Sequence, residues 1–270
     1  MLKKIRLDRL LIERGLVESR EKARAFILEG NVLVNGMRVD KAGAMVMADA
    51  PLEILQEIPY VSRGGLKLEE AIRSFRINIE DKTAMDVGAS TGGFTDCLLQ
   101  HRARKVYAID VGYGQFAWSL RHNPKVVLLE KTNIRYLEKE LIKDAIDIAT
   151  IDVSFISILK VIPKVLEFLT PCGEIIALIK PQFEAGRESV GKGGVVRDEA
   201  KRLEVVEKIK IKAQELGLNV IGIVQSPLPG PKGNIEYFVY LKKTANPSRT
   251  PGCESIRNKE RLQVFSRGLK

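Results

Sequence analysis

The sequence is short of the residues that build metal and disulfide sites, with 3 cysteines and 2 histidines among 270 residues. Cys97, Cys172 and Cys253 form no C-x-x-C pair, and with His101 and His122 they give no plausible metal-ligand spacing. The sequence therefore predicts no metal centre and favours a reducing, cytoplasmic setting.

Long apolar runs are also missing. No uninterrupted apolar stretch approaches the roughly 20 residues of a membrane span. Residues 1–20 carry acids and arginines where a signal peptide would have its apolar core. Apolar residues still make up 45% of the chain, so we expect a soluble, intracellular protein with ordinary cores and a length that suits two domains.

Acidic residues are outnumbered, since 44 lysines and arginines face 34 aspartates and glutamates, for a formal net charge of +10. Such an excess favours a polyanionic partner. Charge alone does not separate nucleic acid from a membrane surface, so the partner has to be identified from motifs.

The predicted fold is organised around residues 85–94, which read as the end of a strand, a turn of small residues and the start of a helix. An apolar strand ending in Asp86 leads into glycines at 88, 92 and 93 and then a helix, and a second strand, 105–109, ends in Asp110. Small residues let a bulky ligand approach the backbone, and an acid roughly 20 residues further on commonly binds ribose hydroxyls. The spacing of these glycines does not match the dinucleotide fingerprint. A nucleoside cofactor site is the leading interpretation; a glycine-rich turn without a ligand is the alternative.

Residues 1–58 are predicted to form a small separate unit. Leu7, Leu10 and Leu11 share one face of a helix, a second helix begins after Ser19, and Asn35-Gly36 predicts a hairpin. The polar side of the two helices is basic and carries Lys3, Lys4, Arg6, Arg9, Arg20, Lys22 and Arg24.

The segment around Pro59, residues 59–63, is the predicted linker to a second domain over 64–245, and 246–270 is a basic tail. The tail is either a flexible arm or a short docked helix. A helix follows the linker and places Lys67 near its start, where a cation is mildly unfavourable.

Strands and helices alternate through the second domain, which predicts an α/β fold with a mostly parallel sheet covered on both faces. The expected strands are 85–87, 105–109, 126–129, 147–153, 174–180, 219–225 and 236–241, and the expected helices include 93–101, 156–169 and 197–216. Ligands in such sheets bind at the carboxyl ends of strands.

Polar residues gather at those predicted strand ends. Asp86, Asp110, Asp152 and Lys180 all end apolar strands, and Asn133 follows the strand at 126–129. A lysine buried at a strand end is costly unless it is paired or partly neutral. If the strands of Asp152 and Lys180 are neighbours, the two form an acid–base pair, and a reversed last strand brings Glu236 to the same edge. The glycine- and proline-rich loops 190–194 (with Lys192) and 227–233 either shape the approach of a substrate or are plain connections.

The N-terminal region resembles the S4 RNA-binding domain. The resemblance rests on R-L-D-R-L-L, S-R-E-K-A-R-A-F-I and G-N-V-L-V-N-G within residues 5–52. It implies that the basic helix face and Arg63 bind RNA, whereas a solvated basic surface on a generic module is the alternative.

The rest of the chain resembles the FtsJ-like ribose 2′-O-methyltransferases, and with the S4-like region the TlyA family, also called hemolysin A. The motifs are S-R-G-G-L-K-L, D-V-G-A-S-T-G-G-F-T-D, I-D-V-S-F-I-S, L-I-K-P-Q-F-E and G-N-I-E-Y, over residues 62–237. The resemblance implies a Rossmann-like class I methyltransferase fold, S-adenosyl-L-methionine as cofactor, and methylation of a ribose 2′-hydroxyl, of cytidine, in ribosomal RNA or ribosomal subunits.

The same resemblance implies roles for individual residues. Lys67, Asp152, Lys180 and Glu236 match the family's K-D-K-E set, with Lys180 as the base, Asp152 holding its amine, and Lys67 and Glu236 orienting the ribose. The implied cofactor contacts are Asp86, Gly88, Ser90, Gly92, Gly93, Phe94, Asp110, Asn133 and Asp152. No metal is implied. The alternatives are a non-catalytic RNA-binding assembly factor, a membrane-active hemolysin and a small-molecule methyltransferase, and the oligomeric state stays open.

Overall fold

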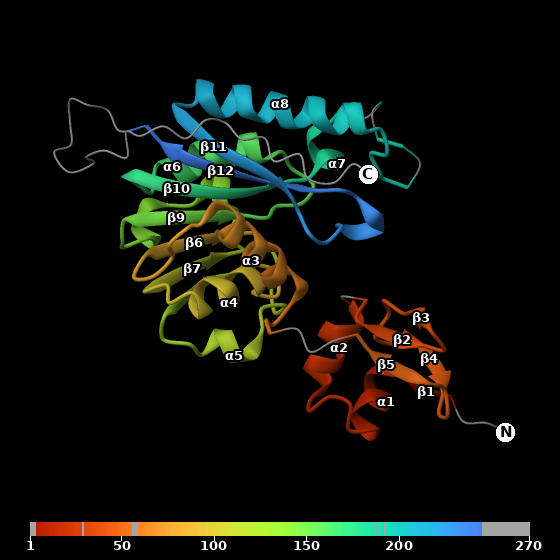
Figure 1. Ribbon diagram of the computed structural model, residues 1–270. Helices are drawn as coiled ribbons and strands as arrows, with labels where there is room; N and C mark the ends of the chain where they lie inside the picture. Colours follow the sequence, from red (N-terminus) through yellow and green to blue (C-terminus); the bar gives the residue numbers. More distant parts are fainter. Residues whose placement is uncertain are drawn as a thin grey trace. The chain divides into compact units, whose positions relative to one another are not determined.

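The computed structural model describes residues 4–28, 30–55, 59–186, 188, 190–191 and 193–244. Lys3, Lys192 and the predicted tail lie outside this part of the chain. The chain divides into two compact units, Met1–Leu66 and Lys67–Lys270. Figure 1 shows both, and each is described here by itself.

The first unit has two helices and two small antiparallel sheets. The helices are α1 (Leu7–Glu13) and α2 (Arg20–Leu28); β1 (Lys4–Arg6) pairs with β4 (Met45–Met47), and β2 (Val32–Val34) pairs with β3 (Met37–Arg38) and β5 (Leu52–Ile54). Leu7, Leu10 and Leu11 are all buried, which confirms the predicted inner face of the first helix. Asn35 and Gly36 both have positive φ (52° and 74°), as the predicted hairpin turn requires.

The second unit is built on a seven-stranded sheet with the order β11-β12-β10-β9-β6-β7-β8. Every pairing from β10 to β8 is parallel, while β12 runs antiparallel to β10 and β11. The strands are β6 (Thr83–Val87), β7 (Lys105–Ile109), β8 (Val126–Leu129), β9 (Ile146–Ile151), β10 (Leu169–Ile179), β11 (Leu218–Gln225) and β12 (Tyr237–Lys243). The predicted α/β class is confirmed.

Helices cover both faces of this sheet (Figure 1). They are α3 (Arg63–Phe75), α4 (Gly93–Gln100), α5 (Trp118–Arg121), α6 (Ile162–Leu166), α7 (Pro181–Glu184) and α8 (Glu199–Glu215), with 3-10 turns η1 (Ile134–Tyr136), η2 (Lys139–Leu141), η3 (Ile158–Lys160) and η5 (Pro231–Gly233). Side chains of β12 alternate between the two cores. Val239 packs in the core that includes α6 and α8, whereas Phe238 contacts Phe94 of α4, with ring centroids 6.1 Å apart.

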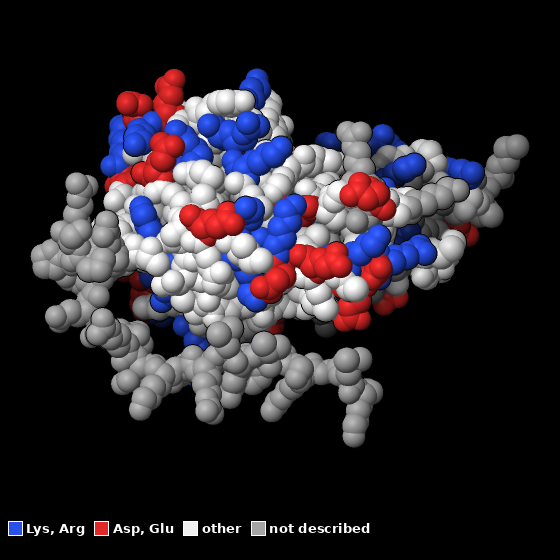
Figure 2. Space-filling view, turned by 90° about the horizontal axis from the view of Figure 1, so that it is seen from above, with Lys and Arg blue, Asp and Glu red and all other residues white. Residues whose placement is uncertain are grey.

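The face that bears α8 carries charges of both signs. Figure 2 shows lysines and arginines interspersed with aspartates and glutamates there, and α8 itself holds the pairs Lys210–Glu207 and Lys212–Glu215. Charges neutralised in this way give no basic patch of one sign, so this face does not match the footprint of a nucleic acid.

Three sequence predictions need correction. The helix expected at 156–169 is split into η3 and α6, because Pro163 at the start of α6 lacks the N–H that a continuous helix would use. Lys67 is the fifth residue of α3 rather than near its start, since Ser62 precedes the helix and accepts a hydrogen bond from the N–H of Gly64. Asp86 lies inside β6 instead of ending it.

Candidate active site

Three of the predicted side chains converge at one edge of the sheet. Asp152 follows β9 and Lys180 follows β10, and these two strands are parallel neighbours, as their predicted pairing required. Glu236 precedes β12, which runs antiparallel to β10 and pairs Tyr237 with Ile179. The reversed strand therefore brings Glu236 to the carboxyl edge, although β11, not β12, is the outermost strand.

Lys180 is held by two oxygen atoms. Its Nζ lies 2.6 Å from Asp152 Oδ1 and donates a hydrogen bond of 3.0 Å to Ser154 Oγ. The side chain of Lys180 is 10% exposed and that of Asp152 is 23% exposed. The amine is thus fixed at the end of β10 with a narrow path to solvent, which suits a group that exchanges a proton with a bound substrate.

Lys67 and Glu236 form a second, deeper ion pair. Lys67 Nζ lies 2.7 Å from Glu236 Oε2, with side-chain exposures of 12% and 0%. Gly230 leaves the space for this carboxylate, because a Cβ on Gly230 would lie 2.0 Å from Glu236 Oε1. The two partners are 169 residues apart in sequence, and α3 and the start of β12 bring them together.

Gln182 contacts the Lys67–Glu236 pair and was not predicted as a site residue. It lies on α7, two residues after Lys180, and its Nε2 donates a 3.5 Å hydrogen bond to Glu236 Oε1. Its Oε1 is buried and has no hydrogen-bond partner among the described residues. Ser154 was also missed. Gln182 and Ser154 both lie inside motifs on which the family resemblance rests, and this position was the sequence feature that could have identified them.

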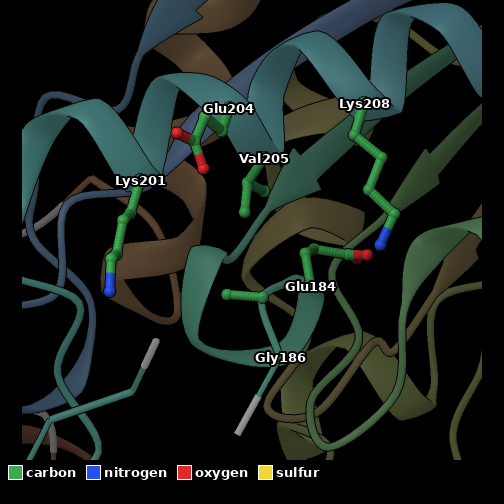
Figure 3. Close-up of a pocket in the computed structure, with 7 residues that line it drawn as sticks. Glu184, Gly186, Lys201, Glu204, Val205 and Lys208 are labelled. Atoms are coloured by element: carbon green, nitrogen blue, oxygen red, sulfur yellow. The ribbon is translucent and has the colours of Figure 1, made fainter. Parts of the chain in front are cut away.

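Glu184 connects the short helix α7 to the 3-10 turn η3. The buried carboxylate accepts a 2.8 Å hydrogen bond from the N–H of Ile158 in η3, and burial raises its pKa. Figure 3 shows Glu184 pointing towards Lys208 in a small pocket between α7 and α8, lined also by Val205 and Gly186. None of Lys67, Asp152, Lys180 and Glu236 lines this pocket, so it is separate from the candidate active site.

The glycine turn between β6 and α4 has structural reasons of its own. Gly88 and Gly92 have φ of 86° and 95°, and Ser90 also has positive φ (49°). A Cβ on Gly88 would lie 2.3 Å from the carbonyl oxygen of Asp152, and one on Gly92 would contact Leu120. The turn therefore brings the end of β6 against the residue that pairs with Lys180.

Asp110 accepts hydrogen bonds from the turn. Its Oδ2 accepts from the N–H of Ser90 (2.7 Å), and its Oδ1 accepts from the N–H of Gly112 (2.6 Å) and from Gln115 (3.1 Å). Because each carboxylate oxygen can accept about two hydrogen bonds, Oδ2 keeps room for a donor such as a ribose hydroxyl. An acceptor at the end of β7, beside the turn after β6 in which Ser90 is exposed, fits a nucleoside.

Other predicted cofactor residues have different surroundings. Phe94 is buried against Phe238, and Gly93 opens α4. Asn133 is exposed, and its Oδ1 caps η1 by accepting from the N–H of Arg135.

Asp86 is fully buried, with Oδ2 accepting from Thr95 Oγ1 at 2.7 Å and Oδ1 from Thr150 Oγ1 at 3.0 Å. A strand buried on both faces tolerates a carboxyl group only with such partners. Asp86 therefore ties β6 to α4 and β9 beneath the turn.

The carboxyl group of Asp86 predicts a pH-dependent stability. Burial raises its pKa from 3.8 to about 7 against the opposing effect of the two threonine hydroxyls. The folded state thus binds the proton more tightly, so this contribution to stability is present below about pH 4 and lost as the pH rises through 7. We expect Asp86→Asn to remove that loss, which amounts to at most about 4 kcal/mol. Urea unfolding from pH 4 to 8 measures it, and parallel curves for both proteins would contradict the assignment.

In the first unit, two predicted RNA-binding arginines are fixed by one buried acid. Asp8 accepts from Arg6 (3.0 and 2.8 Å) and from Arg20 (3.2 Å), and it has no exposed side-chain surface. The Arg6 hydrogen bond holds the pKa of Asp8 down at about 2. Arg9 pairs with Glu13 and Lys22 with Glu18, while Lys4 and Arg24 are exposed. Arg63 opens α3, within the first unit.

A seven-stranded sheet with one antiparallel strand beside its edge, a glycine turn after β6 and lysine–acid pairs at the carboxyl edge defines a methyltransferase fold. The FtsJ-like methyltransferase family model matches residues 60–243, and the S4 domain model matches residues 5–49. The chain belongs to the FtsJ-like methyltransferase family and carries an N-terminal S4 domain.

Relatives and solved structures match most of the chain. It is 43% identical over 244 residues to the 16S/23S rRNA (cytidine-2′-O)-methyltransferase TlyA of Mycobacterium tuberculosis, covering 90% of this chain and 91% of the relative. It is 44% identical over 238 residues to hemolysin A of Brachyspira hyodysenteriae, covering 88% and 99%. The structure of a candidate hemolysin from Streptococcus thermophilus superposes with a TM-score of 0.72 at 42% identity, covering 90% of each chain. Among the described residues, no helix has the length and apolar character needed to cross a membrane.

Proposed function

We propose that the protein methylates a ribose 2′-hydroxyl in ribosomal RNA, of a cytidine, with S-adenosylmethionine as methyl donor. The observation that carries the proposal is the pairing of Lys180 with Asp152 and of Lys67 with Glu236 around one edge of a methyltransferase sheet. The relative from Mycobacterium tuberculosis, a cytidine-2′-O-methyltransferase by name, supports the choice of substrate. With this substrate, the proposal includes a cytoplasmic location and ribosomal subunits or their RNA as partners.

The glycine turn and Asp110 would hold the cofactor. Gly88, Ser90, Gly92 and Gly93 offer a close backbone approach, and Asp110 Oδ2 offers an acceptor for a ribose hydroxyl. When bound there, S-adenosylmethionine supplies a methyl group already activated on a sulfonium. Asp152 lies next to the turn, because its carbonyl oxygen is the atom that a Cβ on Gly88 would touch. The Lys180–Asp152 pair therefore borders the turn that would hold the cofactor.

Lys180 acts as the base. Once the Lys180 ammonium has released a proton, its free amine would accept the hydroxyl proton while the ribose oxygen takes the methyl group from the sulfonium, so the positive charge would end on the lysine ammonium. Asp152, 2.6 Å away, stabilises that ammonium, and Ser154 fixes the direction of the amine. Lys67 and Glu236 orient the ribose, because a buried ion pair holds both side chains in fixed positions.

An exposed phenylalanine that packs on a half-buried one beside this edge suits RNA. Phe155, three residues after Asp152, is 91% exposed with positive φ (65°), and its ring centroid lies 5.1 Å from that of Phe183 on α7. A base unstacked from RNA can pack on such a ring. The S4 domain adds phosphate contacts from Arg6 and Arg20, oriented by Asp8.

Replacing Asp8 with asparagine tests that orientation. Removing a negative charge from a basic face would strengthen RNA binding if only net charge mattered. We expect the opposite, a severalfold rise in KM for RNA with little change in kcat, because Arg6 and Arg20 lose their shared anchor. Steady-state kinetics measures the effect, with Asp49→Asn as the control because it makes the same charge change at an exposed acid of the first unit, and thermal unfolding confirms the fold. Tighter RNA binding by Asp8→Asn would contradict this role.

Transfer of labelled methyl from S-adenosylmethionine to small subunits, large subunits and naked ribosomal RNA tests the proposed function. We expect transfer to at least one of these substrates at a rate that depends on the protein. Tight RNA binding with no transfer to any of them would refute the enzyme and favour the non-catalytic assembly factor.

A further inference from the structure

Three side chains with metal-binding atoms meet between α3 and α4, outside the active site. Glu69 lies on α3, Cys97 lies on α4, and His101 lies one turn later at the C-cap of α4. Glu69 Oε2 is 2.6 Å from His101 Nε2 and 3.8 Å from Cys97 Sγ, and all three ligand atoms lie within 4.8 Å of one another. We propose that this cluster binds one divalent transition-metal ion of the Zn²⁺ type.

The donor set has the chemistry of such an ion. A thiolate, an imidazole and a carboxylate are the three ligand types that Zn²⁺ accepts, and three protein ligands leave one position for water. The sulfur disfavours Mg²⁺ and Ca²⁺, which take oxygen ligands. Ligand atoms around tetrahedral Zn²⁺ lie roughly 3.3–3.6 Å apart. The observed separations of 2.6 and 3.8 Å fall on either side of that value, so small side-chain shifts complete the site.

Burial gives the site both a closed and an open side. Cys97 is fully buried, whereas the side chains of His101 and Glu69 are 32% and 38% exposed. An ion can therefore reach the thiol from the side of His101 and Glu69. Binding exchanges the thiol proton of Cys97 for the metal, so affinity falls as the pH falls.

The position of the cluster gives the ion a structural role. Glu69 follows Lys67 by two residues on α3, and α4 begins at Gly93, where the glycine turn ends. An ion shared by Glu69, Cys97 and His101 would tie the helix of Lys67 to the helix that leads out of the turn. It would touch none of the reacting atoms, so the inference stands apart from the proposed methyl transfer.

Cobalt titration of the full chain, freed of metal by a chelator, tests the site. We expect one Co²⁺ per chain and a thiolate-to-metal charge-transfer band in the near ultraviolet. Cys97→Ala should lose the band and bind at least tenfold more weakly, and His101→Asn should also bind at least tenfold more weakly. His122→Asn is the matched control, because His122 is the other histidine and contacts only the Trp118 carbonyl and ring among the interactions described.

The outcomes are decisive in both directions. Loss of the band in Cys97→Ala with retention in His122→Asn supports the site. A band that persists in Cys97→Ala comes from another thiol and overturns it, as does the lack of stoichiometric binding by the native chain. If Cys97→Ala does not fold, Glu69→Gln replaces it, with the same tenfold weakening expected and native affinity overturning the site.

Discussion

Replacing Lys180 with alanine is expected to reduce methyl transfer by about 10²–10⁴-fold while RNA binding stays intact. The amine that takes the hydroxyl proton is removed, and Asp152 is left without its cation at 2.6 Å. Single-turnover transfer of labelled methyl, measured with saturating RNA, separates this loss from any change in binding.

Lys180→Arg is the sharper variant of the same test. A guanidinium keeps the positive charge and can pair with Asp152, but it stays protonated and cannot accept the hydroxyl proton. We expect it to be nearly as inactive as Lys180→Ala. Substantial activity in Lys180→Arg would show that charge at this position is sufficient and would remove Lys180 as the base.

Replacing Glu236 with alanine should damage stability and activity together. Lys67, only 12% exposed, would lose its partner, and removing one member of a buried ion pair typically costs about 3–5 kcal/mol. Gln182 would lose its acceptor as well. Urea unfolding and labelled methyl transfer on the same preparation measure both effects, and native stability in Glu236→Ala would contradict the buried pair.

A double variant separates the two effects. Lys67→Met combined with Glu236→Leu replaces the pair by apolar side chains of similar size, which often restores stability. We expect most of the lost stability to return while transfer stays at least tenfold below native. Recovery of full activity would mean that the pair serves only the fold.

Local patterns in the sequence predict most of the helices and strands, but they do not predict which distant side chains meet in the fold. Asn35-Gly36 predicts its hairpin because only residues tolerant of positive φ fit that turn, and the strands from β6 to β12 follow from their apolar runs. Lys67 and Glu236 are 169 residues apart in the sequence, and no local spacing of residues indicates that they form an ion pair. Only the family resemblance linked them in advance, and that resemblance also contained Gln182 and Ser154 without assigning them.

The glycine turn shows how a local signal can have two causes. The sequence favours a ligand as the reason for Gly88 and Gly92, whereas the structure gives each a neighbour that a Cβ would strike: the Asp152 carbonyl and Leu120. Asp86 is similar, since its carboxyl group is bound by Thr95 and Thr150 beneath the turn. These contacts depend on strand order and helix packing, which residue spacing does not specify.

The position of the transferred methyl group tests the central claim most directly. A 2′-O-methyl group removes the nucleophile of alkaline RNA cleavage, so the adjacent phosphodiester survives alkali. We predict that ribosomal RNA labelled by the native protein and digested with alkali yields the label in an alkali-resistant dinucleotide that begins with a methylated cytidine. Label released in a mononucleotide would mean methylation of a base, and it would contradict a ribose-directed reaction at Lys180.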